Sequence, residues 1–567
     1  MSDKKDLAIP GRRQLFKVTA VTAASLLSPP TGTASGYSWT TDSQPPFTAP
    51  FVEPLPVRTP KLPVSALIPA ATEAAQADEA GRDPHQRWNT LMPRKFYEVI
   101  VQESTHSFHK DLPPQAIWGY DGILPGPTFV ATAGEPVIVR FYNNLPSTAS
   151  GFGSPEISTH LHNGHVASES DGYAGNYFSR TRFGPTLTRP GKFYDNHYPN
   201  NFAGIDGSAS GFGDAREAMG TMWYHDHREE FTAANVYRGL AGFYLLFDEI
   251  DSGNENDANP KALRLPSGVG QYDIPLVFHD PRFDATGTRV FDQFDPDGFI
   301  GNKFSVNGKI QPFFSVANRK YRFRLLDGGP SRFYEFYLTS NNIDQPFFFI
   351  ANDGNLLPAP LTVSKVRMAP AERADIVIDF SKYPLGSQLY LVNRLVQTNG
   401  RGPSGLQTPG EQVLRFDVNR DVFRNDPSQV PTTLRALPPI NIADATMSRT
   451  FTFDRRNGAW LINGATFDVN TPAFTVKRGA GEIWTLRGSW GWHHPIHIHL
   501  EEGRILSRNG QPPPPEESGR KDIFVLGPND EMKIFIRFRD FLGKYMMHCH
   551  NTVHEDHAMM LRFDVVS

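Results

Sequence analysis

Cysteine is almost absent from this chain, which has one cysteine, Cys549, in 567 residues. A single cysteine excludes any disulfide bond within the chain, so its thiol is inert, reactive or a metal ligand. No segment approaches the about 20 apolar residues that a transmembrane helix requires, so we expect no membrane span. An excess of positive charge is also lacking, because the net charge is -4 and the pI is near 6.5. This balance gives no reason to expect nucleic acid or an anionic membrane as a partner.

Glycine and proline, in contrast, are frequent, with 48 residues of each, and aromatic residues make up 12% of the chain. This composition is typical of a loop-rich all-β protein and less so of a helical one. Strand-like runs at 96–101, 136–141, 242–247 and 374–380 are separated by turn signals such as the Asp-Gly pair at 121–122. The sequence therefore predicts an all-β fold.

The strand-like runs fall into three blocks. A chain of 567 residues is too long for one core and suggests three or four domains of about 150 residues. Short strands with frequent turns in each block indicate three β-sandwiches or barrels in series. Residues 36–92, rich in proline, alanine and threonine, predict an extended arm with little core of its own. The predicted blocks and linkers are, in order, 93–250, a linker at 251–270, 271–420, a linker at 421–448, and 449–567.

The first 35 residues resemble an export signal. Residues 12–17, RRQLFK, are similar to the twin-arginine motif, and a short apolar stretch follows at 18–27. Small residues near Ala34 suit a cleavage site. Two arginines also fit a basic tail with no role in targeting. We expect a protein that folds first, is carried out by export machinery, and is periplasmic or secreted.

The strongest chemical signal surrounds the single cysteine. His554 follows Cys549 by five residues, and Met559 follows after five more. A cysteine, two histidines and a weak axial methionine are the ligands of a blue-copper electron-transfer site. Neighbouring side chains of a strand point to opposite faces, so we expect His548 and His550 to bind different coppers from the copper at Cys549. The tripeptide would then join two metal sites over a distance on the order of 10 Å.

Histidines recur at a His-x-His spacing elsewhere in the chain. This spacing places two imidazoles on one face of a strand, as a metal cluster requires. One such pair is weak evidence, because roughly one is expected by chance among 18 histidines. Several pairs, one of them flanking the only cysteine, predict a metal centre. The clusters are HLH at 160–162, HDH at 225–227, HPIHIH at 494–499 and HCH at 548–550.

These motifs resemble those of the three-domain multicopper oxidases, and within that family most closely those of bacterial spore-coat laccases and bilirubin oxidases. The likeness is carried by HLH, by WYHDH at 223–227, by HPIHIH and by HCHNTVHEDHAMM at 548–560, and it covers the chain from about residue 95 onward. The resemblance implies three consecutive cupredoxin-like Greek-key β-sandwich domains. It also implies copper as the cofactor, with four ions per chain: one type 1, one type 2 and a type 3 pair.

The family's roles transfer to this sequence motif by motif. The resemblance implies a type 1 copper at His494, Cys549, His554 and Met559. It implies a type 2 copper at the first histidine of HLH and the middle histidine of HPIHIH. The other six histidines of the four motifs would hold a type 3 pair of coppers. Which type 3 copper takes which of these histidines stays open. First-block and third-block histidines must then meet across a domain interface. The type 2 ligands are His160 and His497, and the type 3 ligands are His162, His225 and His550 on one side and His227, His499 and His548 on the other.

Three further residues match functional positions of the family. Asp171 and Glu555 match acids that supply protons near the type 2 and type 3 coppers. Asp171 also fits a turn residue, and Glu555 also fits a residue that anchors a metal ligand. Trp492 matches a tryptophan near the type 1 site and equally fits a core aromatic. Two details depart from the pattern: Asn163 follows HLH where the family has glycine, and His493 competes with its neighbour His494 as a ligand.

The resemblance implies one-electron oxidation of phenolic, aminophenolic or tetrapyrrole-type donors and four-electron reduction of dioxygen to water. The expected partners are therefore a small-molecule electron donor and dioxygen, while the oligomeric state stays open. One alternative is a metal-ion oxidase acting on manganese or cuprous copper. The 11 methionines, which form no cluster beyond pairs beside the copper motif, argue against a dedicated cuprous oxidase. Another alternative is a copper-binding protein without turnover, although every expected ligand is present.

Overall fold

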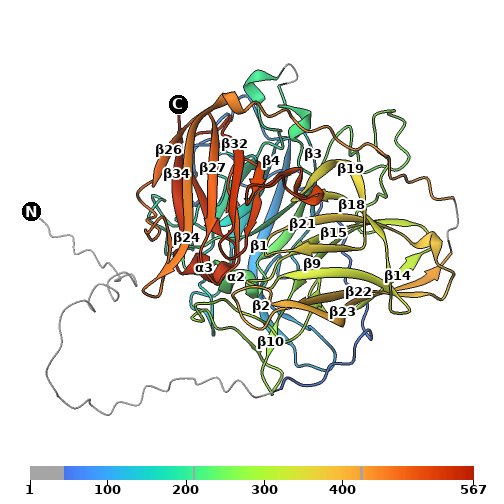
Figure 1. Ribbon diagram of the computed structural model, residues 1–567. Helices are drawn as coiled ribbons and strands as arrows, with labels where there is room; N and C mark the ends of the chain where they lie inside the picture. The colour runs from blue at the N-terminus through green and yellow to red at the C-terminus, as the bar shows by residue number, and fades with distance from the viewer. Residues whose placement is uncertain (1–43, 209–210, 422–424) are drawn as a thin grey trace, which may run out of the picture. The chain divides into compact units, whose positions relative to one another are not determined.

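Strands dominate the computed structural model, which describes residues 44–208, 211–421 and 425–567 (Figure 1). The α-helices within these residues are short: α2 (Thr232–Arg238) and α3 (Thr552–Asp556). The predicted all-β class is therefore confirmed. None of the helices described is long and apolar enough to cross a membrane. The export signal predicted at 1–35 lies outside the described residues.

Two four-stranded sheets form the first block, with the orders β2-β1-β4-β6 and β3-β8-β7-β5. In β1 the side chains of Tyr97, Val99 and Val101 are buried and those between them are more exposed, as in a strand with one face on a core. The histidine-bearing strands β5 and β7 are instead buried along their whole length. The bounds are β1 (Lys95–His106), β2 (Gln115–Tyr120), β3 (Phe129–Thr132), β4 (Val137–Asn143), β5 (Thr159–His162), β6 (Phe193–Tyr198), β7 (Thr221–Asp226) and β8 (Ala241–Phe247).

The second block holds a seven-stranded sheet, β13-β12-β9-β15-β21-β18-β19, and a six-stranded sheet, β14-β23-β22-β16-β17, with β20 beside β16. Apolar side chains of both sheets form one buried core. The bounds are β9 (Asp273–His279), β12 (Ser305–Val306), β13 (Lys309–Ile310), β14 (Phe313–Ala317), β15 (Lys320–Asp327), β16 (Tyr334–Ser340), β17 (Ile343–Gln345), β18 (Phe347–Asn352), β19 (Asn355–Val363), β20 (Lys365–Met368), β21 (Arg373–Asp379), β22 (Gln388–Val396) and β23 (Gly405–Arg420).

The third block holds a six-stranded sheet, β25-β24-β27-β32-β29-β30, and a five-stranded sheet, β26-β34-β33-β28-β31. In the second sheet β28 and β33, which carry histidines, are direct antiparallel neighbours. The bounds are β24 (Ala445–Arg456), β25 (Ala459–Ile462), β26 (Phe474–Lys477), β27 (Gly481–Gly488), β28 (His494–Ile498), β29 (Gly503–Arg508), β30 (Arg520–Lys521), β31 (Ile523–Leu526), β32 (Glu531–Arg537), β33 (Gly543–Cys549) and β34 (Met560–Val566).

Residues 44–92 run along all three blocks. Isolated β-bridges join this segment to the first and second blocks. Leu55 is buried in the core of the second block, Ala80 in that of the first and Leu91 in that of the third. The predicted arm therefore contributes apolar side chains to each core, and burial of such side chains stabilises the contact. The exact domain boundaries stay a prediction.

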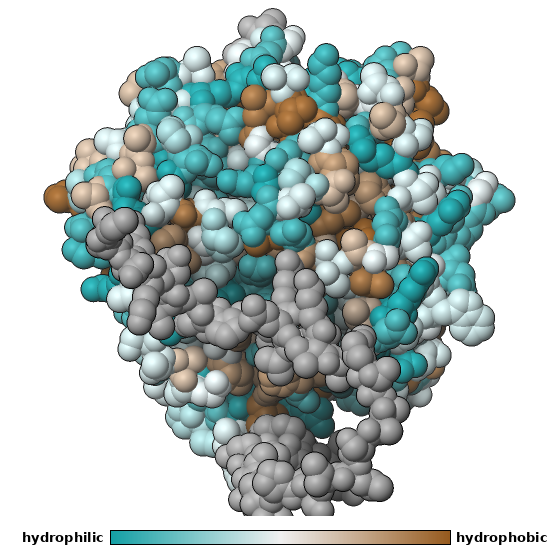
Figure 2. Space-filling view, turned by 90° about the vertical axis from the view of Figure 1, so that its left-hand side faces the viewer, coloured by the Kyte–Doolittle hydropathy of each residue, from teal (hydrophilic) through white to brown (hydrophobic). Residues whose placement is uncertain are grey.

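One face of the molecule is mainly hydrophilic. Figure 2 shows hydrophilic side chains over most of one face, with separate hydrophobic patches between them. Scattered apolar side chains are ordinary on a folded protein. One large residue is relevant to the site described next: Trp490, which is 81% exposed.

Candidate metal centres

The single cysteine lies between two imidazoles. Its Sγ atom is 3.5 Å from Nδ1 of His494 and 3.6 Å from Nδ1 of His554. Pairing of β28 with β33 brings His494 close, because Ile496 lies opposite Cys549. Helix α3 begins three residues after Cys549 and turns His554 back toward the thiol. Met559 is fully buried in the same core, and its carbonyl oxygen accepts a hydrogen bond of 3.1 Å from the Cys549 amide.

These side chains suit a cation. Nε2 of His554 donates a hydrogen bond of 3.0 Å to the Asp297 carbonyl oxygen, so Nδ1, which faces the thiol, is the unprotonated nitrogen. Burial lowers the pKa of His494 to about 3, which keeps this imidazole neutral. Burial raises the pKa of Cys549, so the thiol needs a nearby positive charge to ionise. One sulfur and two neutral nitrogens converging in a buried space fit copper.

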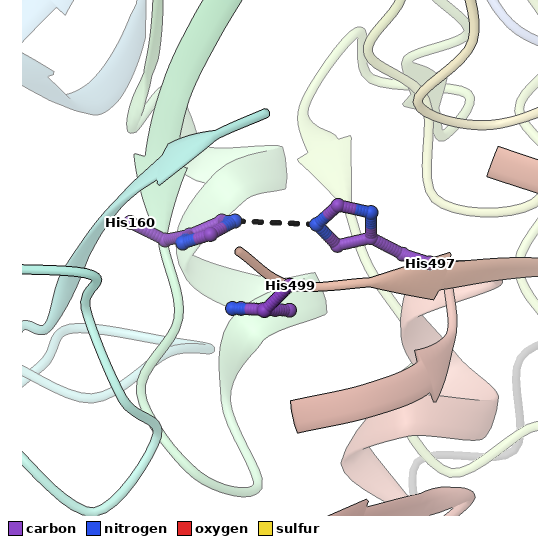
Figure 3. Close-up of side chains that lie close together, drawn as sticks. All are labelled: His160, His497 and His499. Carbon is purple, nitrogen blue, oxygen red and sulfur yellow. Dashed lines mark hydrogen bonds between the residues drawn. The ribbon is translucent and has the colours of Figure 1, made fainter. Parts of the chain in front are cut away.

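The second centre is formed by eight histidines from two blocks. Nε2 of His160, on β5, lies 3.3 Å from Nε2 of His497, on β28, as the dashed line in Figure 3 shows. The ring of His499 stacks under that of His160 with 4.0 Å between ring centroids. All eight side chains are buried. The first block supplies His160, His162, His225 and His227, and the third supplies His497, His499, His548 and His550.

Two groups of three histidines are recognisable within this cluster. In one, Nε2 of His548 lies 3.2 Å from Nε2 of both His227 and His499. In the other, Nδ1 of His162 lies 3.4 Å from Nε2 of His225, and the ring of His550 is 5.1 Å and 5.3 Å from those two rings. The assignment of these groups to the two type 3 coppers stays a prediction.

Hydrogen bonds at the back of the imidazoles fix which nitrogen carries the proton. Nδ1 of His497 donates to the Asp522 carbonyl oxygen at 3.0 Å, and Nδ1 of His225 donates to the Asp226 carbonyl oxygen at 2.9 Å. Nδ1 of His160 donates likewise to the Asp171 carbonyl oxygen. Each of these Nε2 atoms is therefore an unprotonated acceptor: those of His160 and His497 face each other, and that of His225 faces Nδ1 of His162.

Converging acceptors cannot hydrogen-bond to one another, and a shared cation would satisfy them. Both ring nitrogens of His550 are buried without a hydrogen-bond partner, as such a site predicts. Burial, followed by the neighbouring imidazoles, lowers the pKa of His160, His497 and His499 well below the ordinary value. These three imidazoles are thus neutral, the form in which histidine binds a metal ion.

Asp171 and Glu555 both contact imidazoles of this cluster. Oδ2 of Asp171 accepts a 2.7 Å hydrogen bond from Nδ1 of His499. The carboxylate of Glu555 lies 3.0 Å from Nδ1 of His548 and 3.3 Å from Nδ1 of His227. Burial raises the pKa of Asp171. Burial also acts to raise the pKa of Glu555, but the facing imidazoles hold it well below its usual value. Each acid therefore orients ligands, while its role in proton supply stays a prediction.

Trp492 is separated from the cysteine site by one other aromatic ring, that of Trp460. It packs edge-on against Trp460 with 5.2 Å between ring centroids. Trp460 in turn contacts the imidazole of His554 at 3.9 Å between ring centroids and that of His494 at 5.6 Å. His494, and not His493, faces the thiol; Nδ1 of His493 instead lies 3.3 Å from the Arg401 carbonyl oxygen.

The sequence did not indicate three residues that support the ligands. Asp522 places Oδ2 3.0 Å from Nε2 of His162 and is held by both terminal nitrogens of Arg373, at 2.9 Å and 3.0 Å. Trp223 stacks on His225 with 4.2 Å between ring centroids. The carbonyl oxygen of Asp297, in the second block, accepts the hydrogen bond from Nε2 of His554. Of these, only Trp223 lies inside a histidine motif, and Asp297 has no signal in the sequence.

Asn163, the departure after HLH, takes part in the junction of all three blocks. Its side-chain amide donates to Glu502 at 2.7 Å and to the Asp353 carbonyl oxygen at 2.9 Å. Its φ angle of 68° lies in the left-handed region, which asparagine tolerates better than most residues. An asparagine at this turn therefore replaces the expected glycine and adds contacts between blocks.

Fold and centres together define a copper-binding protein built of β-sandwiches. Two multicopper oxidase family models match the chain, one over residues 101–187 and the other over residues 435–567. The chain is 35% identical over 565 residues to a bilirubin oxidase of Albifimbria verrucaria, covering 97% of this chain and 87% of that protein. It is 32% identical over 524 residues to a laccase of Bacillus subtilis, covering 83% of this chain and 94% of the relative. The chain therefore belongs to the multicopper oxidase family.

Solved structures agree. A multicopper oxidase of Aquifex aeolicus matches with a TM-score of 0.68 and 25% identity, covering 84% of this chain and 97% of the other. A laccase of Pediococcus acidilactici shows the same fold, with a TM-score of 0.71 and 23% identity, covering 92% of this chain and 96% of the other. The prediction of cupredoxin-like domains is confirmed, and the protein is a copper-dependent oxidoreductase that uses dioxygen.

Proposed function

We propose that the chain binds four copper ions, one of type 1, one of type 2 and a type 3 pair. The observation that carries this proposal is the strand β33, in which Cys549 stands between His548 and His550. The thiol lies with His494 and His554, while its two neighbours lie in the histidine cluster. The residues that would hold the ions are His494, Cys549, His554 and Met559 for type 1, His160 and His497 for type 2, and His162, His225, His227, His499, His548 and His550 for the type 3 pair.

When bound, the coppers would take single electrons from a donor and supply four to dioxygen, which yields water. The chain contributes a covalent path between the centres, because Cys549 shares peptide bonds with ligands of the cluster. It also excludes water from both centres, since every ligand side chain is buried. Water formation requires protons as well as electrons. We assign their supply to Asp171 and Glu555, which contact Nδ1 atoms of His499 and His548.

Aromatic small molecules are the proposed donors: phenols, aminophenols or tetrapyrroles. The relatives named bilirubin oxidase and laccase support this class. So does the surface near the cysteine site, where Trp492 is half-buried beneath Arg401, whose guanidinium lies 4.9 Å from the indole centroid. Trp490 nearby is largely exposed. Flat aromatic donors suit stacking on such side chains.

A metal-ion oxidase, acting on manganese or cuprous copper, is the second candidate. The few methionines of the chain, 11 in all, argue against a cuprous donor.

We further propose that the protein reaches the periplasm or the medium through a twin-arginine-type signal at residues 1–35. Replacement of Arg12 and Arg13 by lysine should then leave the protein inside the cell. Export of that variant at the normal level would contradict the proposal.

The decisive experiment combines three measurements on one copper-reconstituted sample: copper per chain, visible absorption, and dioxygen uptake with a phenolic donor, bilirubin or manganese(II). Four coppers per chain, an intense blue band, and uptake with the aromatic donors are expected. Uptake with manganese alone would favour the second candidate. Bound copper without a blue band would contradict the assignment of Cys549.

A further inference from the structure

One glutamine of the arm, Gln86, bonds to segments of both the first and the third block. Nε2 of Gln86 donates to Oε2 of Glu169 at 3.0 Å and to the Leu542 carbonyl oxygen at 2.9 Å. Oε1 of the same amide accepts from the Leu542 amide at 2.9 Å, and the backbone amide of Gln86 donates to Oε1 of Glu169 at 2.7 Å. Both donor hydrogens of the side-chain amide are thus used. Gln86 therefore ties a turn of the first block to the third block.

The two partners of Gln86 each lie just before residues of the cluster. Glu169 is two residues before Asp171, which bonds to the imidazoles of His160 and His499. Leu542 directly precedes β33 (Gly543–Cys549), the strand that carries His548. Gln86 therefore bonds to the turn that leads to Asp171 and to the residue that leads into β33.

The interface beneath Gln86 is closely packed. A Cβ atom on Gly543 would lie 2.2 Å from Oγ of Ser168, and the φ angle of this glycine, 113°, is in the region that favours glycine. The hydroxyl of Tyr545 donates to the Val166 carbonyl oxygen at 3.1 Å. The turn before Asp171 thus touches the start of β33 directly, and a change in their spacing would reach the cluster.

Glu169 depends on these bonds. Its side chain is 3% exposed, and burial raises its pKa, while the two donors of Gln86 act in the opposite direction. Removal of the amide would leave a buried carboxylate and the Leu542 peptide groups short of partners, and unmet buried polar groups force local rearrangement.

We propose that Gln86 is a positioning residue for the dioxygen-reducing histidine cluster, because it fixes the turn bearing Asp171 against the strand bearing His548. Metal ligands must be held within about 0.5 Å of their working positions, and neighbouring residues provide that precision. The arm is thereby part of the reduction site although it supplies no ligand. This inference rests on the copper assignment proposed above.

The test compares Gln86→Leu with Gln76→Leu. Gln76 is the matched control, because it lies in the same arm, is half-buried, and donates its side-chain amide to Ala70 within that arm. Two rates are measured by stopped flow: anaerobic bleaching of the blue band by a phenolic donor, and its return on adding dioxygen. In the same samples, a chelator titration follows two losses. One is the loss of the copper that gives the blue band, and the other is the loss of the remaining copper, which we call colourless copper.

In Gln86→Leu we expect bleaching at the normal rate, return of the blue band slowed by about tenfold, and colourless copper lost at about tenfold lower chelator concentration. Gln76→Leu should match the wild type in each respect. Equal loss of blue and colourless copper would indicate general destabilisation and overturn the proposal, as would identical behaviour of the two variants. If the wild type itself holds no colourless copper, the proposed copper assignment fails instead.

A pair of substitutions keeps the test independent of lost packing. Gln86→Glu places two carboxylates against each other, and adding Glu169→Gln restores an amide facing a carboxylate. The double variant should recover part of the reoxidation rate that Gln86→Glu loses. A double variant no faster than Gln86→Glu would overturn the role of the Gln86–Glu169 contact.

Discussion

The two metal centres of this protein differ in how they are assembled. The residues predicted to hold the type 1 copper all lie between His494 and Met559, within the third block. The histidine cluster takes half of its side chains from residues 160–227 and half from residues 497–550. The first centre requires one block to fold, and the second requires two blocks to dock.

This difference appears in the supporting contacts. At the cysteine site the block's own Trp460 contacts the imidazoles, and the second block contributes the Asp297 carbonyl oxygen behind His554. At the histidine cluster, supports cross between blocks: Asp171 of the first block bonds His499 of the third. Substitutions at the two centres should therefore separate blue colour from dioxygen reduction.

The largest effect is expected for Cys549→Ser, which removes the thiolate. The blue absorption and the oxidase activity should both be abolished, because no path would remain from the donor to the cluster. Most of the remaining copper should stay bound, since serine does not disturb the histidines. Visible absorption and metal analysis on one sample test this. Retained blue colour would contradict the type 1 assignment.

His160→Ala should differ from Cys549→Ser in colour. The blue band should persist, because the cysteine site lies within the third block, while dioxygen uptake should stop. His109→Ala is a suitable control, since His109 is also buried in the first block but bonds to the Ala49 carbonyl oxygen in the arm. Continued turnover of the His160 variant would exclude this residue from the cluster.

A smaller loss is expected for Glu555→Gln, because the side chain supports ligands without being one. Substitution of such a partner typically costs about 10- to 100-fold in activity or metal affinity. Glutamine retains the shape but not the charge that faces His548 and His227. Reoxidation of the reduced enzyme by dioxygen measures the effect. Glu335→Gln, a buried glutamate of the second block, is the control and should leave this rate unchanged.

Met559→Leu should have the smallest effect. The side chains are similar in volume, so stability should fall by less than about 1.5 kcal/mol. The variant should stay blue, and the reduction potential of the cysteine copper should rise because the weak axial donor is lost. A redox titration beside Met532→Leu, a buried methionine of the same core, tests this. An equal potential in both variants would exclude Met559 as the axial ligand.

Short-range patterns in the sequence predicted much of the chemistry. The spacing of Cys549, His554 and Met559 needs only a strand end and one helical turn to bring the side chains together. Strand alternation likewise places the two histidines of each His-x-His pair on one face. Prediction of the fold class succeeded for a similar reason, because glycine, proline and aromatic content report on local turns and strands. Family resemblance then supplied the pairing of motifs.

Contacts between distant segments could not be predicted in this way. The role of Asp297 beside His554 spans 257 residues, and Gln86 meets Leu542 across 456 residues. No periodicity links such pairs, since their proximity follows from the docking of blocks and from the path of the arm. The family resemblance likewise points to Trp492, two residues before His494, whereas Trp460 is the ring that contacts the imidazoles.

The sequence by itself determined the ligand types, their grouping into motifs and the all-β class, because each depends on spacing along one strand or turn. Only the tertiary structure decided which nitrogen of each imidazole faces the metal space, which acid stands behind it, and how the arm joins the two halves of the cluster. Those features depend on hydrogen bonds and packing between blocks, and such long-range contacts leave no regular trace in the order of residues.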